Sequence, residues 1–204
     1  MKYALAISAA LLLATAHAGD EVQLPGLRVD GAQHSVTAAG HIALTNGILE
    51  FLAVETGGRD YESLLTLTCR PSALKFALLL VGLTEGETTG TVLRLDVEWA
   101  AGGKTNRVPA ESLLLERRTG RVPSGLPFIF TGSFFGPDLS GTNQIFHADL
   151  EQSHIALWWQ PSALINVRDA NGNPYRGDDQ GFEVNSKAVP PVGTPIQLLF
   201  RRRE

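Results

Sequence analysis

The chain has 204 residues, 44% of them hydrophobic, with 17 Lys and Arg against 21 Asp and Glu and a formal net charge of −4. This length is enough to bury a good-sized core, and the mildly acidic charge with scattered basic residues argues against nucleic-acid binding. The single cysteine, Cys69, excludes an internal disulfide and a four-cysteine iron–sulfur cluster, so folded stability must come from packing.

Residues 1–18 have the pattern of a secretory signal. A lysine precedes a short apolar run, and Ala16-His17-Ala18 forms a small-residue cleavage motif. The run is shorter than the roughly 20 residues needed to cross a bilayer, so we expect cleavage after Ala18 and no membrane span in the mature chain. Exported proteins of this size with one cysteine are typical of bacteria. We therefore expect a periplasmic or secreted protein, with residues 19–204 as a single α+β domain.

The first half of the mature chain is predicted to begin with strands. Alternating apolar and polar residues indicate strands at residues 27–30 and 34–44. Asn46-Gly47 is a strong hairpin signal that leads into a strand at residues 48–55. The polar heptapeptide 57–63 follows, where paired glycines allow a tight turn because glycine accepts positive φ.

Residues 70–82 give the clearest helix signal. Pro71 suits the first helical position, and Gly82 suits the position just past the end. Lys75 is the only charged residue between them. A helix that is apolar almost all round is expected to be buried, here against a sheet.

The second half is predicted to be mostly strand. Residues 91–99 alternate apolar and charged side chains, which indicates a half-buried antiparallel strand, and a glycine turn leads into a partner strand at 104–108. A short helix is expected at 109–118 and a loop at 132–142. Further strands are predicted at 128–131, 144–149, 154–160, 182–185 and 196–200. The terminal Arg201-Arg202-Arg203 is expected to be a solvated basic tail.

These elements together predict the fold class. Strands and a few helices that do not alternate strictly favour an α+β fold over a doubly wound one. The expected architecture is a mainly antiparallel sheet with one buried apolar helix and short accessory helices.

The heptapeptide 57–63 is the leading candidate for a binding surface, because binding residues tend to lie on loops held by a rigid scaffold. Tyr61 would supply contact area, and Arg59 would recognise a carboxylate or phosphate. Glu62 and Ser63 would orient the ligand.

Glu50 belongs to the same candidate site. It shares a face of the predicted strand with apolar residues, and a buried carboxylate either finds a partner or takes up a proton. Arg59 and Lys75 are the plausible partners. A structural ion pair is favoured over a catalytic acid.

Several segments resemble a known family. They read GILEF at 47–51, GRDYESL at 58–64 and ALLLVG at 77–82, followed by VEW at 97–99, FTGS at 130–133 and PPVGTP at 190–195. On these motifs the chain resembles the bacterial YdjY-domain family over most of residues 24–200. The resemblance implies an exported bacterial protein of unassigned function, with Glu50, Tyr61, Glu62 and Ser63 at motif positions.

A hydrolase is the first alternative function. Glu50 or Glu62 would act as the base, and Ser63 or Cys69 as the nucleophile. Cys69 precedes Arg70 at the start of the predicted helix, and both a nearby arginine and a helix N-terminus lower a thiol pKa. The competing interpretation of this cysteine is a small buried core residue.

Metal handling is the second alternative. One antiparallel register would place His147 and His154 opposite each other, where they could hold zinc or copper with a third ligand. The segment Asp169–Asp179 resembles the start of a calcium loop but departs from it at its sixth and twelfth positions, and it also suits a polar turn.

The favoured interpretation is a non-enzymatic binding or interaction module. Its partner would be a small ligand, a polymer or another protein, met through Glu50, Arg59, Tyr61, Glu62 and Ser63. The sequence assigns no catalytic residue, cofactor or metal site.

Overall fold

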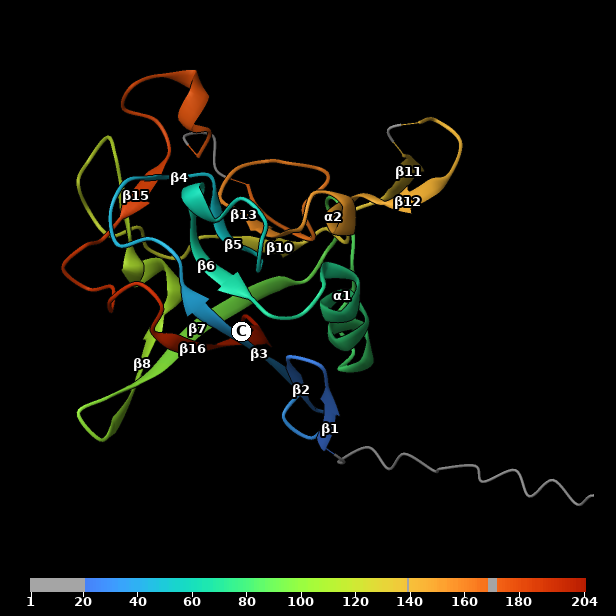
Figure 1. Cartoon of the computed structure of the whole chain (residues 1–204), viewed down its shortest axis with the longest axis horizontal. Coiled ribbons are helices and arrows are strands. Elements are labelled where there is room, and N and C mark those ends of the chain that lie inside the picture. Colours follow the sequence, from blue (N-terminus) through green and yellow to red (C-terminus); the bar gives the residue numbers. More distant parts are fainter. Residues whose placement is uncertain (1–20, 139, 169–171) are drawn as a thin grey trace, which may run out of the picture.

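The computed structural model describes residues 21–138, 140–168 and 172–204 (Figure 1), so the proposed signal peptide lies outside the described part. Eight strands form a closed β-barrel in the order β3–β16–β7–β10–β14–β13–β5–β6, and β6 pairs with β3 to complete the circle. Their bounds are β3 Ser35–Ile42, β5 Phe51–Glu55, β6 Ser63–Leu67, β7 Val92–Ala101, β10 Phe128–Phe130, β13 Ser153–Ala156, β14 Ile165–Val167 and β16 Pro195–Arg202.

The predicted α+β fold is therefore wrong. The structure is mostly β, with 41% of the described residues in strands and 13% helical, and its main sheet closes on itself. Most barrel pairs are antiparallel, but β5–β6 and β13–β14 are parallel. The closing pair sets Gly40 of β3 opposite Leu67 of β6, and a Cβ at Gly40 would overlap the Thr66 carbonyl oxygen. Glycine at this position thus permits the close approach that seals the barrel.

The hydrophobic core fills the barrel. Along β7, Leu93, Leu95 and Val97 are buried on one face, as the alternation in the sequence predicts, and Leu198 and Phe200 of β16 join them. The strands β5 and β13 are buried on both faces, and a second, smaller cluster forms there from Phe51, Val54, Ala156 and Ala163.

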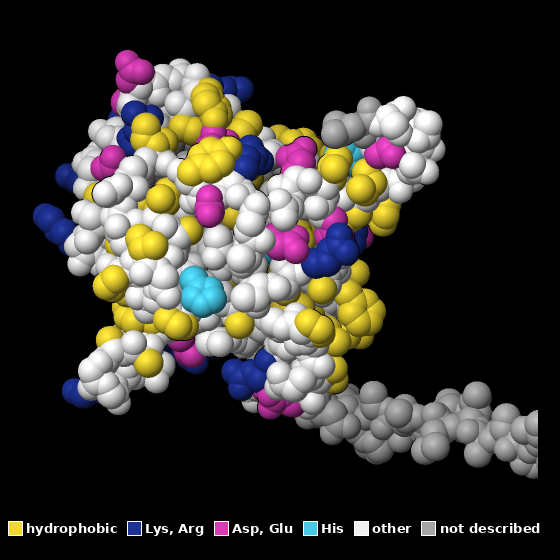
Figure 2. Space-filling model, in the orientation of Figure 1, with side chains coloured by type: hydrophobic (Ala, Val, Ile, Leu, Met, Phe, Trp, Pro, Cys, Tyr) yellow, Lys and Arg dark blue, Asp and Glu magenta, His cyan; other side chains and the backbone are white. Residues whose placement is uncertain are grey.

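The helix α1 (Pro71–Leu80) lies beside the barrel, against β2 (Leu27–Asp30) and β3 (Figure 1). The prediction of a fully buried apolar helix is wrong, because only one face is buried, by Pro71, Leu74, Ala77 and Leu78. The opposite face exposes Phe76, Leu79 and Leu80, and Figure 2 shows hydrophobic side chains on this side of the molecule.

Shorter elements complete the fold. The predicted helix 109–118 is instead the single turn η2 (Ala110–Leu113) followed by strand β9 (Leu114–Glu116). The predicted loop 132–142 contains β11 (Phe135–Pro137), and the predicted strand 144–149 divides into β12 and the short helix α2. The remaining bounds are β1 Glu21–Leu24, β4 Ile48–Leu49, β8 Lys104–Pro109, β12 Gln144–Phe146, α2 His147–Leu150, β15 Phe182–Val184, η1 Asp60–Glu62 and η3 Pro174–Arg176.

Two further observations concern the arginine triplet and the helices. The arginine triplet is not a free tail, because β16 continues through Arg202 and Arg201 forms an ion pair with Asp96. Within residues 21–138, 140–168 and 172–204, no helix combines the length and apolar character needed to span a membrane.

Candidate functional site

The heptapeptide is brought back to the start of β5 by the parallel pairing of β5 and β6. Phe51 is the register partner of Ser63, so the connection after Glu55 must return along the whole length of β5. Gly57 makes the reversal possible with a φ of 91°, a left-handed conformation that side chains disfavour. The path places Arg59 beside the first residues of β5.

Arg59 lies at the centre of three glutamates. Its Nη1 is 3.8 Å from Glu50 Oε2 and 3.4 Å from Glu62 Oε1, and its Nη2 is 3.7 Å from Glu151 Oε2. The guanidinium carbon also lies 4.2 Å from the centre of the Phe51 ring, a favourable cation–π contact. We call Glu50, Arg59, Glu62 and Glu151 the Arg59 cluster.

Glu50 is the buried member of the Arg59 cluster, with only 6% of its surface exposed. Burial is the largest cause that raises its pKa to about 7, and a hydrogen bond with Glu62 and the charge of Glu62 act in the same direction, whereas Arg59 lowers it. The carboxyl therefore keeps its proton to a higher pH than an ordinary glutamate does. Of the two partners expected from the sequence, Arg59 lies beside it, whereas Lys75 pairs with Glu85 at 2.7 Å.

Glu151 was missed by the sequence interpretation. It follows α2, and it enters the cluster because β13 pairs antiparallel with β5, with Ser153 opposite Val54. Its Oε2 accepts hydrogen bonds from Gln160 Nε2 at 3.0 Å and Ser162 Oγ at 2.8 Å, which hold the carboxylate toward Arg59. No local sequence signal marks this residue, because its role depends on the pairing of distant strands.

The other predicted site residues differ sharply in accessibility. Tyr61 is 69% exposed, and Arg59 keeps about a third of its side chain exposed. Ser63 is fully buried, and its Oγ donates a 2.6 Å hydrogen bond to the Arg59 carbonyl oxygen. Ser63 therefore fixes the turn and cannot meet a ligand. Figure 2 shows acidic, basic and hydrophobic side chains gathered over β4, β5 and α2.

The proposed nucleophiles are not activated by their surroundings. Cys69 Sγ lies 3.7 Å from His154 Nε2, and both residues are buried. Burial raises the pKa of Cys69 to about 12 and lowers the pKa of His154 to about 4, so both groups are neutral at pH 7. The pair therefore lacks the thiolate that cysteine chemistry requires.

The two metal hypotheses find no support in the described residues. His147 begins α2 and stacks on Phe134 with ring centroids 4.3 Å apart, whereas His154 is buried in β13 beside Cys69, so the histidines are not cross-strand partners. Within the described ranges, no three His, Cys, Asp or Glu side chains are placed to hold an ion. Residues 169–171 of the calcium-like segment lie outside the described residues.

Two cavities lie away from the Arg59 cluster. One of about 440 Å³ is lined by arginines of β7 and β16, and another of about 430 Å³ lies beside β2. Comparisons with protein-family models, with curated proteins and with solved structures found no match for this chain.

Proposed function

We propose that this chain is a non-enzymatic binding module of an exported bacterial protein of the YdjY-domain type, which binds a cationic side chain of a partner at the Arg59 cluster. The observation that carries the proposal is the exposed Tyr61, two residues along the chain from a surface arginine that is already surrounded by three carboxylates. The geometry supports binding because a rigid closed barrel holds these side chains in fixed positions.

The charge balance favours a cation over the anion expected from the sequence. One guanidinium faces three glutamates, of which the buried Glu50 has a pKa raised to about 7. A carboxylate or phosphate approaching Arg59 would meet net negative charge. A lysine or arginine side chain would instead pair with Glu62 or Glu151 and rest against the Tyr61 ring.

The proposal is tested by measuring the binding of a fluorescein-labelled tetra-lysine peptide by fluorescence anisotropy. A labelled tetra-glutamate peptide, which has the opposite charge, is the control. We expect saturable binding of tetra-lysine only. Tyr61→Ala and Glu151→Gln should each weaken it at least about fivefold, since each loses an interaction of about 1 kcal/mol. Melting temperatures near wild type would show that the variants remain folded.

Glu87→Gln is the matched control, because Glu87 is an exposed glutamate outside the cluster. If Glu87→Gln and Glu151→Gln weaken tetra-lysine binding equally, the peptide responds only to overall charge and the proposed site is wrong. Unchanged binding by Tyr61→Ala would likewise contradict the role of the tyrosine.

A further inference from the structure

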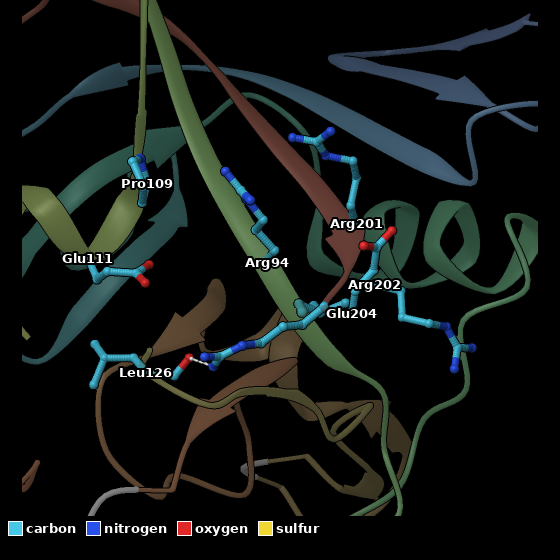
Figure 3. A pocket seen from close by; sticks show the side chains of 9 residues that line it. Arg94, Pro109, Glu111, Leu126, Arg201, Arg202 and Glu204 are labelled. Carbon is cyan, nitrogen blue, oxygen red and sulfur yellow. Dashed lines mark hydrogen bonds between the residues drawn. The ribbon is translucent and has the colours of Figure 1, made fainter. Parts of the chain in front are cut away.

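The cavity of about 440 Å³ beside β7 and β16 has the size of a small-molecule pocket. Four arginines line it, one from β7 and three from the end of the chain: Arg94, Arg201, Arg202 and Arg203. In Figure 3, Pro109, Glu111 and Leu126 lie on one side and Arg201 and Arg202 on the other, with Arg94 between them. Residues far apart in the sequence therefore converge on one hollow.

Two of these arginines are placed directly opposite each other. Arg94 and Arg201 are register partners in the antiparallel pair of β7 and β16, and Figure 3 shows both extending to the same side. Like charges at such a position destabilise a sheet. The carboxylate of Asp96, only 1% exposed, contacts both arginines and reduces their repulsion. Both of its oxygens are 3.3 Å from Arg94 Nε, and Oδ2 pairs with Arg201 Nη2.

Three of the four arginines, Arg94, Arg201 and Arg203, are held in position by ion pairs or hydrogen bonds. One buried carboxylate, that of Asp96, serves two guanidiniums. Arg203 Nη1 donates to the Gly125 carbonyl oxygen at 2.8 Å, a neutral acceptor that fixes the side chain and leaves its charge in place. Arg201 Nε is buried and has no acceptor among the described residues. Four guanidiniums therefore line the pocket, near the side-chain carboxylates of Asp96, Glu111 and Glu204.

We propose that this pocket binds a small organic molecule that carries an oxyanion group, either a carboxylate or a phosphate. Arginine guanidiniums recognise both groups through paired N–H donors, and the fixed side chains lose little entropy on binding. Pro109 and Leu126 on the facing side would contact the apolar part of such a ligand. This site is separate from the Arg59 cluster and has the opposite charge preference.

Isothermal titration calorimetry on the full chain tests the proposal with benzoate, phenyl phosphate, inorganic phosphate and benzyl alcohol. We expect benzoate or phenyl phosphate to bind with a Kd of about 1 mM or tighter, and to bind more weakly as salt is added. The better of the two identifies the oxyanion. Benzyl alcohol, which lacks the charge, should not bind.

Arg94→Gln should weaken binding at least tenfold, and Arg70→Gln serves as its control. Arg70 has a similarly exposed side chain (67% against 59%) and likewise pairs with one aspartate, Asp149, but it precedes α1 and does not line the pocket. If Arg94→Gln fails to fold, Arg203→Gln provides the same test, because Arg203 bonds only to backbone carbonyls.

Three results would overturn the proposal. The first is no measurable heat from either aromatic oxyanion. The second is equal weakening by Arg94→Gln and Arg70→Gln. The third is inorganic phosphate binding as tightly as phenyl phosphate, which would show that the pocket does not select an organic ligand.

Discussion

Within the Arg59 cluster, Glu50 is the residue whose environment departs most clearly from that of a surface side chain. Its pKa is raised from 4.5 to about 7, chiefly by burial. The folded state therefore binds this proton more tightly than the unfolded state, so the contribution of Glu50 to stability falls as pH rises from about 4.5 to about 7. Above that range the folded protein carries the full cost of a buried carboxylate.

We predict that Glu50→Gln, an uncharged side chain of the same shape, relieves this cost. The variant should be about 1–2 kcal/mol more stable relative to wild type at pH 8 than at pH 4.5, since one pKa unit corresponds to about 1.4 kcal/mol and solvent screening reduces the effect. Urea unfolding across this pH range provides the measurement. A stability difference between the two proteins that does not change with pH would show that Glu50 is not held in its protonated form.

The variant must be compared with wild type at each pH, because His154 changes the pH dependence of unfolding free energy in the opposite direction to Glu50. The pKa of His154 is lowered from 6.5 to about 4 by complete burial, so the unfolded state binds more protons in that interval and stability falls as pH decreases through it. Burial also raises the pKa of Glu55. Both contributions are present in wild type and in Glu50→Gln, and they cancel in the difference.

At the scale of elements, α1 shows how an apolar sequence can be buried on one side only. Leu78 is fully buried, whereas Leu80, two residues later, is half exposed. We predict that Leu78→Ala costs about 2–5 kcal/mol of unfolding free energy, as expected for a cavity in a packed core. Leu80→Ala should change it by about 0.5 kcal/mol or less. Chemical denaturation of both variants measures the contrast, and equal large losses would mean that the helix is enclosed on all sides.

The individual strands were largely predictable, because their pattern is local. The alternation of Leu93, Leu95 and Val97 with charged residues located β7. The hairpin predicted at Asn46-Gly47 is wrong, because β3 pairs with neither β4 nor β5 and the predicted strand 48–55 divides into these two strands at Glu50. The closure of the barrel was not predictable, because it depends on long-range pairing between β3 and β6 and on a close contact that Gly40 permits. A single sequence shows which residues favour a strand but not which distant strand will be its neighbour.

The candidate site was predictable to a similar extent. The polar heptapeptide between two apolar runs identified Arg59 and Tyr61 as surface residues, and both are accessible. Ser63 has the same polar character in the sequence, but its hydroxyl is buried and already donates a hydrogen bond to the backbone inside the turn. Glu151 enters only through the pairing of β13 with β5, about 90 residues from the heptapeptide along the chain.

At the scale of the whole molecule, the predicted cleavage site after Ala18 lies two residues ahead of the described part of the chain. The first described element, β1, begins at Glu21, where its register partner is Asp30 of β2. A cut after Ala18 would leave Gly19 and Asp20 ahead of this hairpin. The predicted cleavage therefore removes the apolar leader and leaves every described strand of the fold intact.

We predict that expression of the full chain in a bacterium with an outer membrane yields a periplasmic or secreted protein whose first residue is Gly19. Intact-mass spectrometry and N-terminal sequencing of the exported protein measure this directly. Ala18→Arg places a large charge where signal cleavage needs a small residue, and it should leave the leader attached. Val22→Arg, an equally large change in an exposed residue of β1, is the control and should be cleaved normally. A wild-type protein that remains in the cytoplasm with its leader intact would contradict the proposed export, and with it the assignment of the module to the cell exterior.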